Sequence, residues 1–540
     1  MTPNQETNEL GHMITDDGDF HECESSIQVI TRNETDRCSK AYEMIDASDT
    51  NEPTRVGGRN LRSLSKSFSR QVSRRRSSFN ESLPETPQGW VALISAISSL
   101  ILGYEINLQK KLTCPPSVYG QCQKGSPMHD IFQRLTATAT SLLTRDIHPS
   151  LFVGTRSVMA STAAYALAGP CIKDHVRFRQ LLKMTQDGAL IALDWELPVC
   201  DDELIKPEEQ EKECLLGVIR RPVVLILHGI NNDSSFGYIR ALMRACTDRG
   251  WIAVGMNFRG CGGAPLTTPR GYTGAYTGDI RSVVQNITSR FNDEAKLFLV
   301  GNSLGANLIT KYLGEEGLSE TLPEGVAGGI SLGNPLHIHG DNIHFPWNYL
   351  LAFGVKKGLL ENQKTFKAMR CPQFQAVLHR TMMAPTIQGV DEAIAPILIK
   401  NNPVFPFETR IGYDNADAYW KDASSYLYIR HISVPLLLLT SQDDFLVRDG
   451  SIGKMYYPLA NPNVLVVNTK CGGHLGWQES PPDTGSMFGF GTSWADTATT
   501  DFIDAILQGK KRPTEDYNAM NKSKLKADAL LAASKLPSRL

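Results

Sequence analysis

One turn between an apolar strand and a helix constrains the fold of this chain more than any other feature. The turn, GNSLG at residues 301–305, follows the apolar run Lys296–Val300 and opens the helical stretch Ala306–Leu313. Glycines on both sides of the serine keep Cβ atoms out of a turn that has no room for them, and the serine there adopts a strained backbone angle. The pattern predicts a sharp strand-to-helix turn that presents Ser303 as a nucleophile.

Apolar runs of strand length alternate with helical stretches along residues 178 to 508. They are Val223–Leu227, Trp251–Asn257, Leu297–Val300, Gly329–Leu332, Pro435–Leu439 and Val464–Val467. A hairpin signal precedes them, because Asp187 and Gly188 separate two further strand-like runs. This order favours an α/β fold, with a mostly parallel, doubly wound sheet behind an antiparallel opening hairpin. The segment at about 335–432 is too long for a plain crossover, which predicts an inserted helical cap.

Two polar loops supply the partners that a serine nucleophile needs. Asp443 and Asp444 follow one of the apolar strands, and His474 follows the last one. A histidine takes the proton of the serine, and a carboxylate orients the histidine ring. We therefore expect Ser303, Asp444 and His474 to form a catalytic triad. Asp444 is preferred because it lies one step further out on the loop, and Asp443 is the alternative acid.

The loop after Val223–Leu227 reads His228-Gly229-Ile230. In a fold of this kind we expect the backbone N–H groups of Ile230 and Leu304 to form the oxyanion hole. His228 and Asp233 also match the acyltransferase-like pattern H-x4-D, although a structural histidine is the favoured interpretation.

Neither a metal nor another cofactor is expected. A histidine-rich stretch comprises His337, His339, Asp341 and His344. Its spacing fits no standard metal site, and a polar loop is the preferred interpretation. The eleven cysteines form no pair of zinc or redox spacing. A net charge of −2 with 21% charged residues shows no bias toward nucleic acid as a partner.

These residues resemble the lipase family of α/β-hydrolase-domain proteins, which includes embryogenesis-associated plant proteins, fungal medium-chain ester synthases, and animal monoacylglycerol lipases and phospholipases. The resemblance covers about residues 150–508. It rests on DGALIALDW at 187–195, NFRGCGGAPL at 257–266, the turn and helix GNSLGANLITKYLGEEG at 301–317, and GGHLGW at 472–477. It implies an α/β-hydrolase domain over residues 176–508, with the second residue of the Asp-Asp pair, Asp444, as the acid. The family usually continues with Pro, Phe and a further Pro, whereas this chain has residues 445–448 as FLVR.

The N-terminal residues carry signals of a different kind. Residues 1–88 are polar with few aromatic side chains, so we expect disorder. Basic residues recur there at three- and four-residue steps, at Arg55, Arg59, Arg62, Lys66, Arg70 and Arg74. Both a basic amphipathic helix on an anionic membrane and a solvated basic segment fit this spacing.

A hydrophobic segment at residues 89–112 follows, and its uncharged run Trp90–Tyr104 falls short of the ~20 residues that span a bilayer. A signal anchor, an interfacial helix and a helix packed against the core are all open. Residues 113–175 form an N-terminal extension, and 509–540 form a basic tail that ends Ser538-Arg539-Leu540, similar to a peroxisomal address. Membrane association, at the endoplasmic reticulum or another endomembrane, is the first expectation and the peroxisome the alternative.

The motifs and the resemblance together predict a serine hydrolase. Its expected substrates are acyl esters of lipids, either mono- or triacylglycerols or phospholipids, with short to medium acyl chains. Water would release the acid from an acyl-serine intermediate. An alcohol could attack the same intermediate, so acyl transfer from acyl-CoA to an alcohol is the alternative. A lipid or acyl-ester substrate and a membrane surface are the expected partners, while the oligomeric state stays open.

Overall fold

The computed structural model describes residues 86–509 except 121–125, 138–142, 167–176, 199–216, 269, 344, 368–373, 397–412, 448–457, 459–460 and 481–492. Almost all of the predicted disordered region 1–88, with its basic segment, lies outside the described residues, and so does the tail from residue 510 onward.

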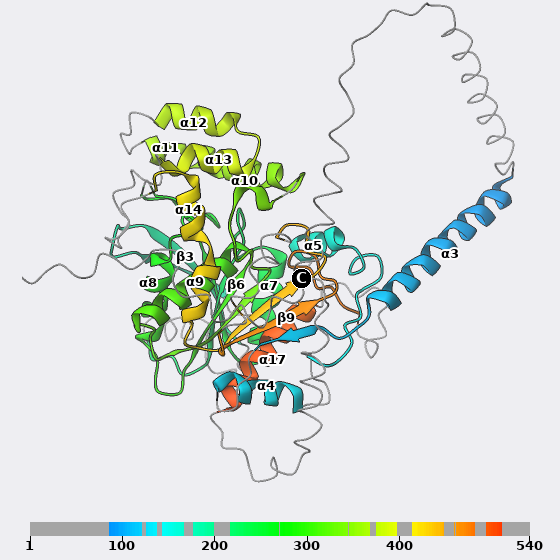
Figure 1. The fold of residues 1–540 in the computed structure, drawn as a ribbon, viewed down its shortest axis with the longest axis horizontal. Coiled ribbons are helices and arrows are strands. Elements are labelled where there is room, and N and C mark those ends of the chain that lie inside the picture. The colour runs from blue at the N-terminus through cyan, green and yellow to red at the C-terminus, as the bar shows by residue number, and fades with distance from the viewer. Residues whose placement is uncertain are drawn as a thin grey trace, which may run out of the picture. The chain divides into compact units, whose positions relative to one another are not determined.

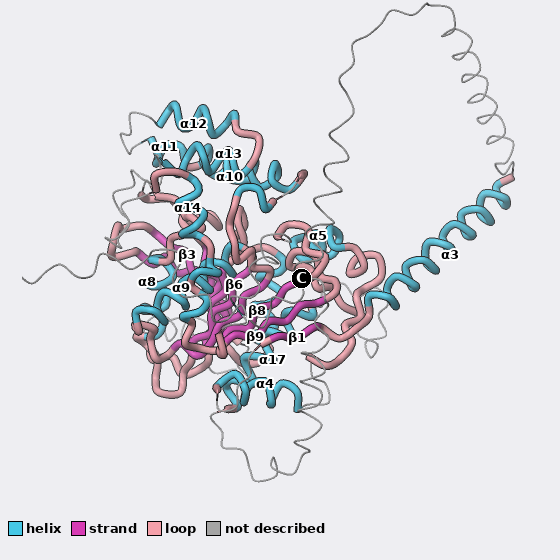
Figure 2. The backbone as a smooth tube through the Cα atoms, viewed as in Figure 1, coloured by secondary structure: helices cyan, strands magenta, loops and turns pink. Residues whose placement is uncertain are grey.

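Nine strands of the described chain form one sheet (Figures 1 and 2). They are β1 (Ser117–Tyr119), β2 (Arg177–Lys183), β3 (Leu190–Glu196), β4 (Val223–Leu227), β5 (Ile252–Asn257), β6 (Leu297–Asn302), β7 (Val326–Leu332), β8 (Leu436–Ser441) and β9 (Val464–Thr469). Their order is β1-β9-β8-β7-β6-β4-β5-β3-β2. The pairs β4–β5, β4–β6, β6–β7, β7–β8 and β8–β9 are parallel, whereas β2–β3, β3–β5 and β1–β9 are antiparallel. The predicted α/β fold with an antiparallel opening hairpin is confirmed.

Helices cover both faces of the sheet, as a doubly wound fold requires. Alternate residues of β4 point to opposite faces: Val223 and Leu225 pack in one core, and Val224 and Ile226 in the other. The first core includes apolar side chains of α8 (Gly278–Thr288) and α9 (Leu304–Ser319). The second includes those of α4 (Pro127–Ala137), α7 (Gly237–Thr247) and α17 (Trp494–Gln508). Every residue of β4, β5, β6 and β8 is buried, which explains why these strands read as continuous apolar runs.

The described part of the segment between β7 and β8 is helical. It contains α10 (Trp347–Glu361), α11 (Gln363–Lys367), α12 (Phe374–Met383), α13 (Ile387–Ile394), α14 (Ala416–Ala423) and the short turns η2 (Gly340–Asn342), η4 (Ser425–Leu427) and η5 (Ile429–His431). Figure 1 shows α10 to α13 grouped together beyond the end of the sheet, with α14 leading back toward α9. This segment is where the cap is predicted.

The hydrophobic segment forms the long helix α3 (Pro87–Leu112), which extends beyond Tyr104. By length and composition it is able to cross a membrane, with a mean hydropathy of 1.7 in its most apolar 18 residues. Its side chains Ile97, Leu100 and Ile101 are 47%, 74% and 50% exposed.

The C-terminal end of α3 packs differently. Glu105 is buried, accepts a hydrogen bond of 2.9 Å from Thr155 Oγ1 and pairs with Arg156. One turn later, Gln109 Nε2 donates to the Pro149 carbonyl at 2.8 Å. These bonds tie the last turns of α3 to the chain that leads into α5 (Ser157–Ala166).

Candidate active site

Ser303 lies in the turn between β6 and α9 with φ 53° and ψ −115°, a conformation that side-chain-bearing residues rarely adopt. The two flanking glycines leave no space for a side chain: a Cβ on Gly301 would lie 2.3 Å from the Gly305 carbonyl oxygen, and one on Gly305 would lie 2.6 Å from that of His228. The Ser303 N–H donates to the Leu332 carbonyl at 2.8 Å, which holds the turn against β7. The turn has the predicted geometry.

The structure brings Ser303, His474 and Asp444 together from three separate loops. His474 Nε2 lies 2.8 Å from Ser303 Oγ, and His474 Nδ1 lies 2.8 Å from Asp444 Oδ2. All three residues are buried, with 6%, 1% and 3% of their surface exposed. The other carboxylate oxygen, Asp444 Oδ1, accepts from the backbone N–H groups of Leu446 at 2.8 Å and Val447 at 3.1 Å. This arrangement allows the Ser303 proton to pass to His474 while Asp444 holds the opposite side of the ring.

Asp443 lies next to this group but contacts the backbone of the histidine loop. Its Oδ1 accepts from the Gly473 N–H at 2.8 Å, and burial raises the pKa of its carboxyl. Ser441 Oγ donates to the Gly473 carbonyl at 2.6 Å. Both bonds act on the residue before His474, so Asp443 positions the loop while Asp444 contacts the ring.

A further contact to the histidine loop comes from α5, which sequence reasoning missed. The His474 N–H donates to Ser161 Oγ at 2.8 Å, and the Ser161 hydroxyl donates to the Ser157 carbonyl. Ser161 lies 313 residues before His474 in a stretch with no recognisable motif. No signal in the sequence links the two.

The two predicted oxyanion residues, Ile230 and Leu304, line a cavity beside Ser303. Leu304 is the first residue of α9, where N–H groups have no partner inside the helix and the helix dipole favours negative charge. The loop of Ile230 approaches closely, since a Cβ on Gly229 would lie 3.3 Å from that of Ser303. Tyr238 fixes this loop by accepting hydrogen bonds from the Gly229 N–H at 3.0 Å and from Asn232 Nδ2 at 2.8 Å.

His228 uses both ring nitrogens within its own surroundings. Nδ1 lies 2.7 Å from the Gly229 carbonyl, and Nε2 lies 3.1 Å from the Phe258 N–H, which donates to it. Burial lowers the pKa of His228 to about 4, so the ring stays neutral. These contacts favour a structural role for His228 over the acyltransferase-like interpretation.

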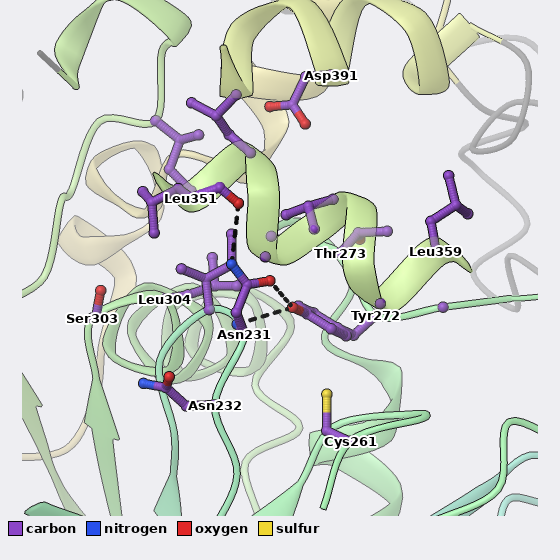
Figure 3. A pocket seen from close by; sticks show the side chains of 18 of the residues that line it. Asn231, Asn232, Cys261, Tyr272, Thr273, Ser303, Leu304, Leu351, Leu359 and Asp391 are labelled. Atoms are coloured by element: carbon purple, nitrogen blue, oxygen red, sulfur yellow. Dashed lines mark hydrogen bonds between the residues drawn. The ribbon is translucent and has the colours of Figure 1, made fainter. Parts of the chain in front are cut away.

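A cavity of about 660 Å³ extends from Ser303 to the helices between β7 and β8. Figure 3 shows Leu351 and Leu359 of α10 on its wall, with Tyr272 and Asn231 below them. Asn231 Nδ2 donates to the Leu351 carbonyl at 3.2 Å, which ties the loop after β4 to α10. The volume is that of a typical small-ligand site, and many of its lining side chains are apolar.

The histidine-rich stretch contributes to this cavity through His337 and His339. The His337 ring packs against Tyr426 and the His339 ring against Trp420, at centroid distances of 5.4 Å and 4.9 Å. The Asp341 side chain and His344 lie outside the described residues. Within the described part of the chain, no group of three or more His, Cys, Asp or Glu side chains is arranged to hold a metal ion.

Comparisons with known proteins point to the same fold. Residues 222–481 match the family model of the alpha/beta hydrolase fold. The chain is 28% identical over 445 residues to the embryogenesis-associated protein EMB8 of Picea glauca, covering 81% of this chain and 86% of that protein. It is 31% identical over 270 residues to the monoacylglycerol lipase of Saccharomyces cerevisiae, covering 48% and 55%. It is 28% identical over 307 residues to the human phospholipase ABHD3, covering 57% and 68%. The predicted resemblance to the lipase family of α/β-hydrolase-domain proteins is confirmed by these matches.

Proposed function

We propose that this chain is a serine hydrolase that cleaves acyl esters of lipids, with Ser303 as the nucleophile. The observation that carries the proposal is the continuous hydrogen-bonded series from Ser303 Oγ through His474 to Asp444, with both links at 2.8 Å, at one side of a largely apolar cavity. A hydroxyl is a weak nucleophile unless a neighbouring base accepts its proton. In this proposal His474 Nε2 is that base, and its distance of 2.8 Å from Ser303 Oγ supports the role.

The reaction follows from these contacts in two halves. Ser303 Oγ attacks the ester carbonyl carbon as its proton moves to His474 Nε2, and Asp444 stabilises the imidazolium through Nδ1–H. The N–H groups of Ile230 and Leu304 donate hydrogen bonds to the developing oxyanion. His474 then protonates the departing alcohol, which leaves an acyl group on Ser303. Water, deprotonated by His474, attacks this acyl-serine and releases the acid.

Lipid esters are the substrate class that the cavity and the relatives favour. A volume of about 660 Å³ holds an acyl chain of short to medium length together with an alcohol group. Two of the relatives carry the names monoacylglycerol lipase and phospholipase, which makes glycerides and phospholipids the first substrates to test.

We further propose that α3 attaches the enzyme to a membrane. The helix has the length and composition to span one, and its apolar side chains at Ile97, Leu100 and Ile101 are exposed. Exposed apolar surface of this extent is typical of a segment that contacts lipid. Endomembranes are the proposed location, and the peroxisome is the alternative.

The test is hydrolysis of monooctanoylglycerol by the detergent-solubilised full chain. Ser303→Ala should lower kcat by about 10³-fold or more, because the residual rate would come from binding and oxyanion contacts alone. Ser289→Ala, at an exposed serine after α8, is the matched control and should retain full activity. Adding an alcohol separates hydrolysis from acyl transfer, since free octanoate marks the first and a new octanoyl ester marks the second. Equal rates in wild type and Ser303→Ala would contradict the proposal.

A further inference from the structure

Two carboxylates line the cavity from the helices between β7 and β8. Glu361 of α10 is exposed and pairs with Lys357 at 3.7 Å, whereas Asp391 has no such cationic partner among the ion pairs of the described residues. Asp391 belongs to α13 and lines the same cavity as Ser303. Figure 3 shows the two residues well apart, with Asp391 above Leu351 and Ser303 low on the other side. The proposed reaction does not use Asp391, because Asp444 already supports His474. An acidic group in a cavity with this many apolar side chains calls for another explanation.

The carboxyl group of Asp391 is oriented by a single side chain. Trp420 Nε1 donates to its Oδ2 at 2.8 Å, and Trp420 itself is 3% exposed, so the donor is fixed in the core. Among the residues that the structure describes, no group donates a hydrogen bond to Asp391 Oδ1. Asp391 is half-buried, and its Oδ1 is not among the fully buried polar atoms that lack a partner, so this oxygen is accessible from the cavity. A ligand in the cavity can supply that partner.

The surroundings of this carboxyl group favour a neutral ligand over a cationic one. Burial raises the pKa of Asp391 to about 7, against the opposing effect of the Trp420 hydrogen bond, and the charge of Glu392 raises it further. Within the described chain no lysine or arginine forms an ion pair with it. Both the acid and the carboxylate are therefore present near neutral pH. A hydroxyl group can donate to the carboxylate and accept from the acid, whereas an ammonium group pairs with the carboxylate alone.

We propose that Asp391, held by Trp420, forms a subsite that binds an aliphatic hydroxyl group of the substrate and so selects hydroxyl-bearing acyl esters. This inference rests on the proposed function, because it assigns substrate recognition to the cavity in which Ser303 acts. Two sources can supply such a hydroxyl: the glycerol head group of a partial glyceride, and a hydroxylated acyl chain.

Three octanoyl esters distinguish these sources in assays of the full chain. Methyl octanoate has no free hydroxyl, monooctanoylglycerol has hydroxyls on the head group, and methyl 8-hydroxyoctanoate has one on the acyl chain. The measured quantity is the kcat/KM of each hydroxyl-bearing ester divided by that of methyl octanoate. Asp391→Leu should lower one of these ratios by roughly 3- to 10-fold, the range for one lost hydrogen bond. The ratio that falls identifies the source.

Further variants separate hydrogen bonding from charge. Asp391→Asn keeps a hydrogen-bonding group of the same shape, so it should lower the ratio less than Asp391→Leu does. Glu392→Gln removes the neighbouring exposed charge and should leave the ratio unchanged. Octanoylcholine tests the cationic alternative: a selective and equal loss of its cleavage in Asp391→Asn and Asp391→Leu would overturn the hydroxyl subsite. If Asp391→Leu fails to fold, Trp420→Phe removes the orienting donor and should lower the same ratio.

Binding to the Ser303→Ala protein tests the subsite without any chemistry. By isothermal titration calorimetry, the hydroxyl-bearing ester that is selected should bind roughly 3- to 10-fold more weakly once Asp391→Leu is added, while methyl octanoate binds equally to both proteins. Wild-type protein that cleaves none of the esters would overturn the proposed function while this binding difference still decides the subsite. Unchanged ratios together with unchanged binding would overturn the subsite and leave the proposed hydrolase intact.

Discussion

Asp443 and Asp444 are adjacent in the sequence and differ in what they contact, so replacing each with asparagine gives opposite expectations. Asp444 Oδ2 accepts from His474 Nδ1, whereas its Oδ1 accepts from two backbone N–H groups, those of Leu446 and Val447. Asp443 Oδ1 accepts from the Gly473 N–H. An asparagine has one carbonyl oxygen to offer, so the position of that oxygen decides the outcome.

In Asp444→Asn, the two backbone N–H groups hold the carbonyl oxygen at the Oδ1 position. The NH₂ group then faces His474 Nδ1 and can only donate to it. The ring is forced into the tautomer that carries its proton on Nε2, and this nitrogen can no longer accept the proton of Ser303. We expect kcat to fall by about 10³- to 10⁴-fold, which is the size of the effect when a triad histidine is held in the wrong tautomer.

In Asp443→Asn, the carbonyl oxygen can keep its hydrogen bond to the Gly473 N–H. Only the charge is lost, and burial already raises the pKa of this carboxyl and so weakens its preference for the charged form. We expect kcat to fall by less than about tenfold, which is equivalent to less than about 1.4 kcal/mol.

The assay is kcat and KM for monooctanoylglycerol with both variants and wild type, and thermal melts serve as the control for folding. The reasoning is refuted if Asp443→Asn is the inactive variant. It is also refuted if a folded Asp444→Asn retains more than about a tenth of wild-type kcat, because the tautomer argument allows no such activity.

Two further predictions concern stability and membrane attachment. Burial lowers the pKa of His228 to about 4 from an unfolded value near 6.5, so its neutral ring contributes stability that is fully present above pH 6.5 and is lost as the pH falls through about 4. Between pH 7 and pH 4, the free energy of unfolding measured in urea should therefore fall by about 3 kcal/mol less in His228→Gln than in wild type. Equal pH dependence of the unfolding free energy in the two proteins would contradict this. Removing residues 1–103 keeps Glu105 and its bonds to Thr155 and Arg156. The truncated protein should therefore stay folded and cleave soluble esters, and it should no longer be found in the membrane fraction. Removing residues 1–112 should also lower Tm, because Arg156 and Thr155 lose their buried partner; equal Tm values, or full-length protein extracted by salt alone, would count against this account of α3.

Much of the fold can be predicted from the sequence because its signals are local. The central strands are buried on both faces and therefore read as apolar runs, and GNSLG at residues 301–305 needs only its own neighbours to form the turn. The ends of helices and strands are predicted less accurately from the sequence. For example, α9 begins at Leu304 and ends at Ser319, well past the predicted end at Leu313. The edge strand β1 was missed because its three residues are strands only through pairing with β9.

The contacts that complete the site depend on distant parts of the chain. Ser161 reaches the backbone of His474 across 313 residues, and no pattern in α5 marks it. Asp391 is one acid among many in the sequence, and its place in the cavity wall follows from how α13 packs against Trp420. Likewise, α3 continues beyond Tyr104, where Glu105 accepts hydrogen bonds from Thr155 and Arg156. The apolar run alone does not reveal these contacts.

The central claim is that Ser303 is an activated nucleophile, and labelling with a fluorophosphonate tests it most directly. The probe reacts with a serine whose hydroxyl is activated by a neighbouring base. Peptide mass spectrometry of folded wild-type protein should find the label on Ser303, the label should be absent from Ser303→Ala, and His474→Ala should react far more slowly. Folded wild-type protein that stays unlabelled, or that carries the label on a different residue while Ser303 is unmodified, would contradict the account.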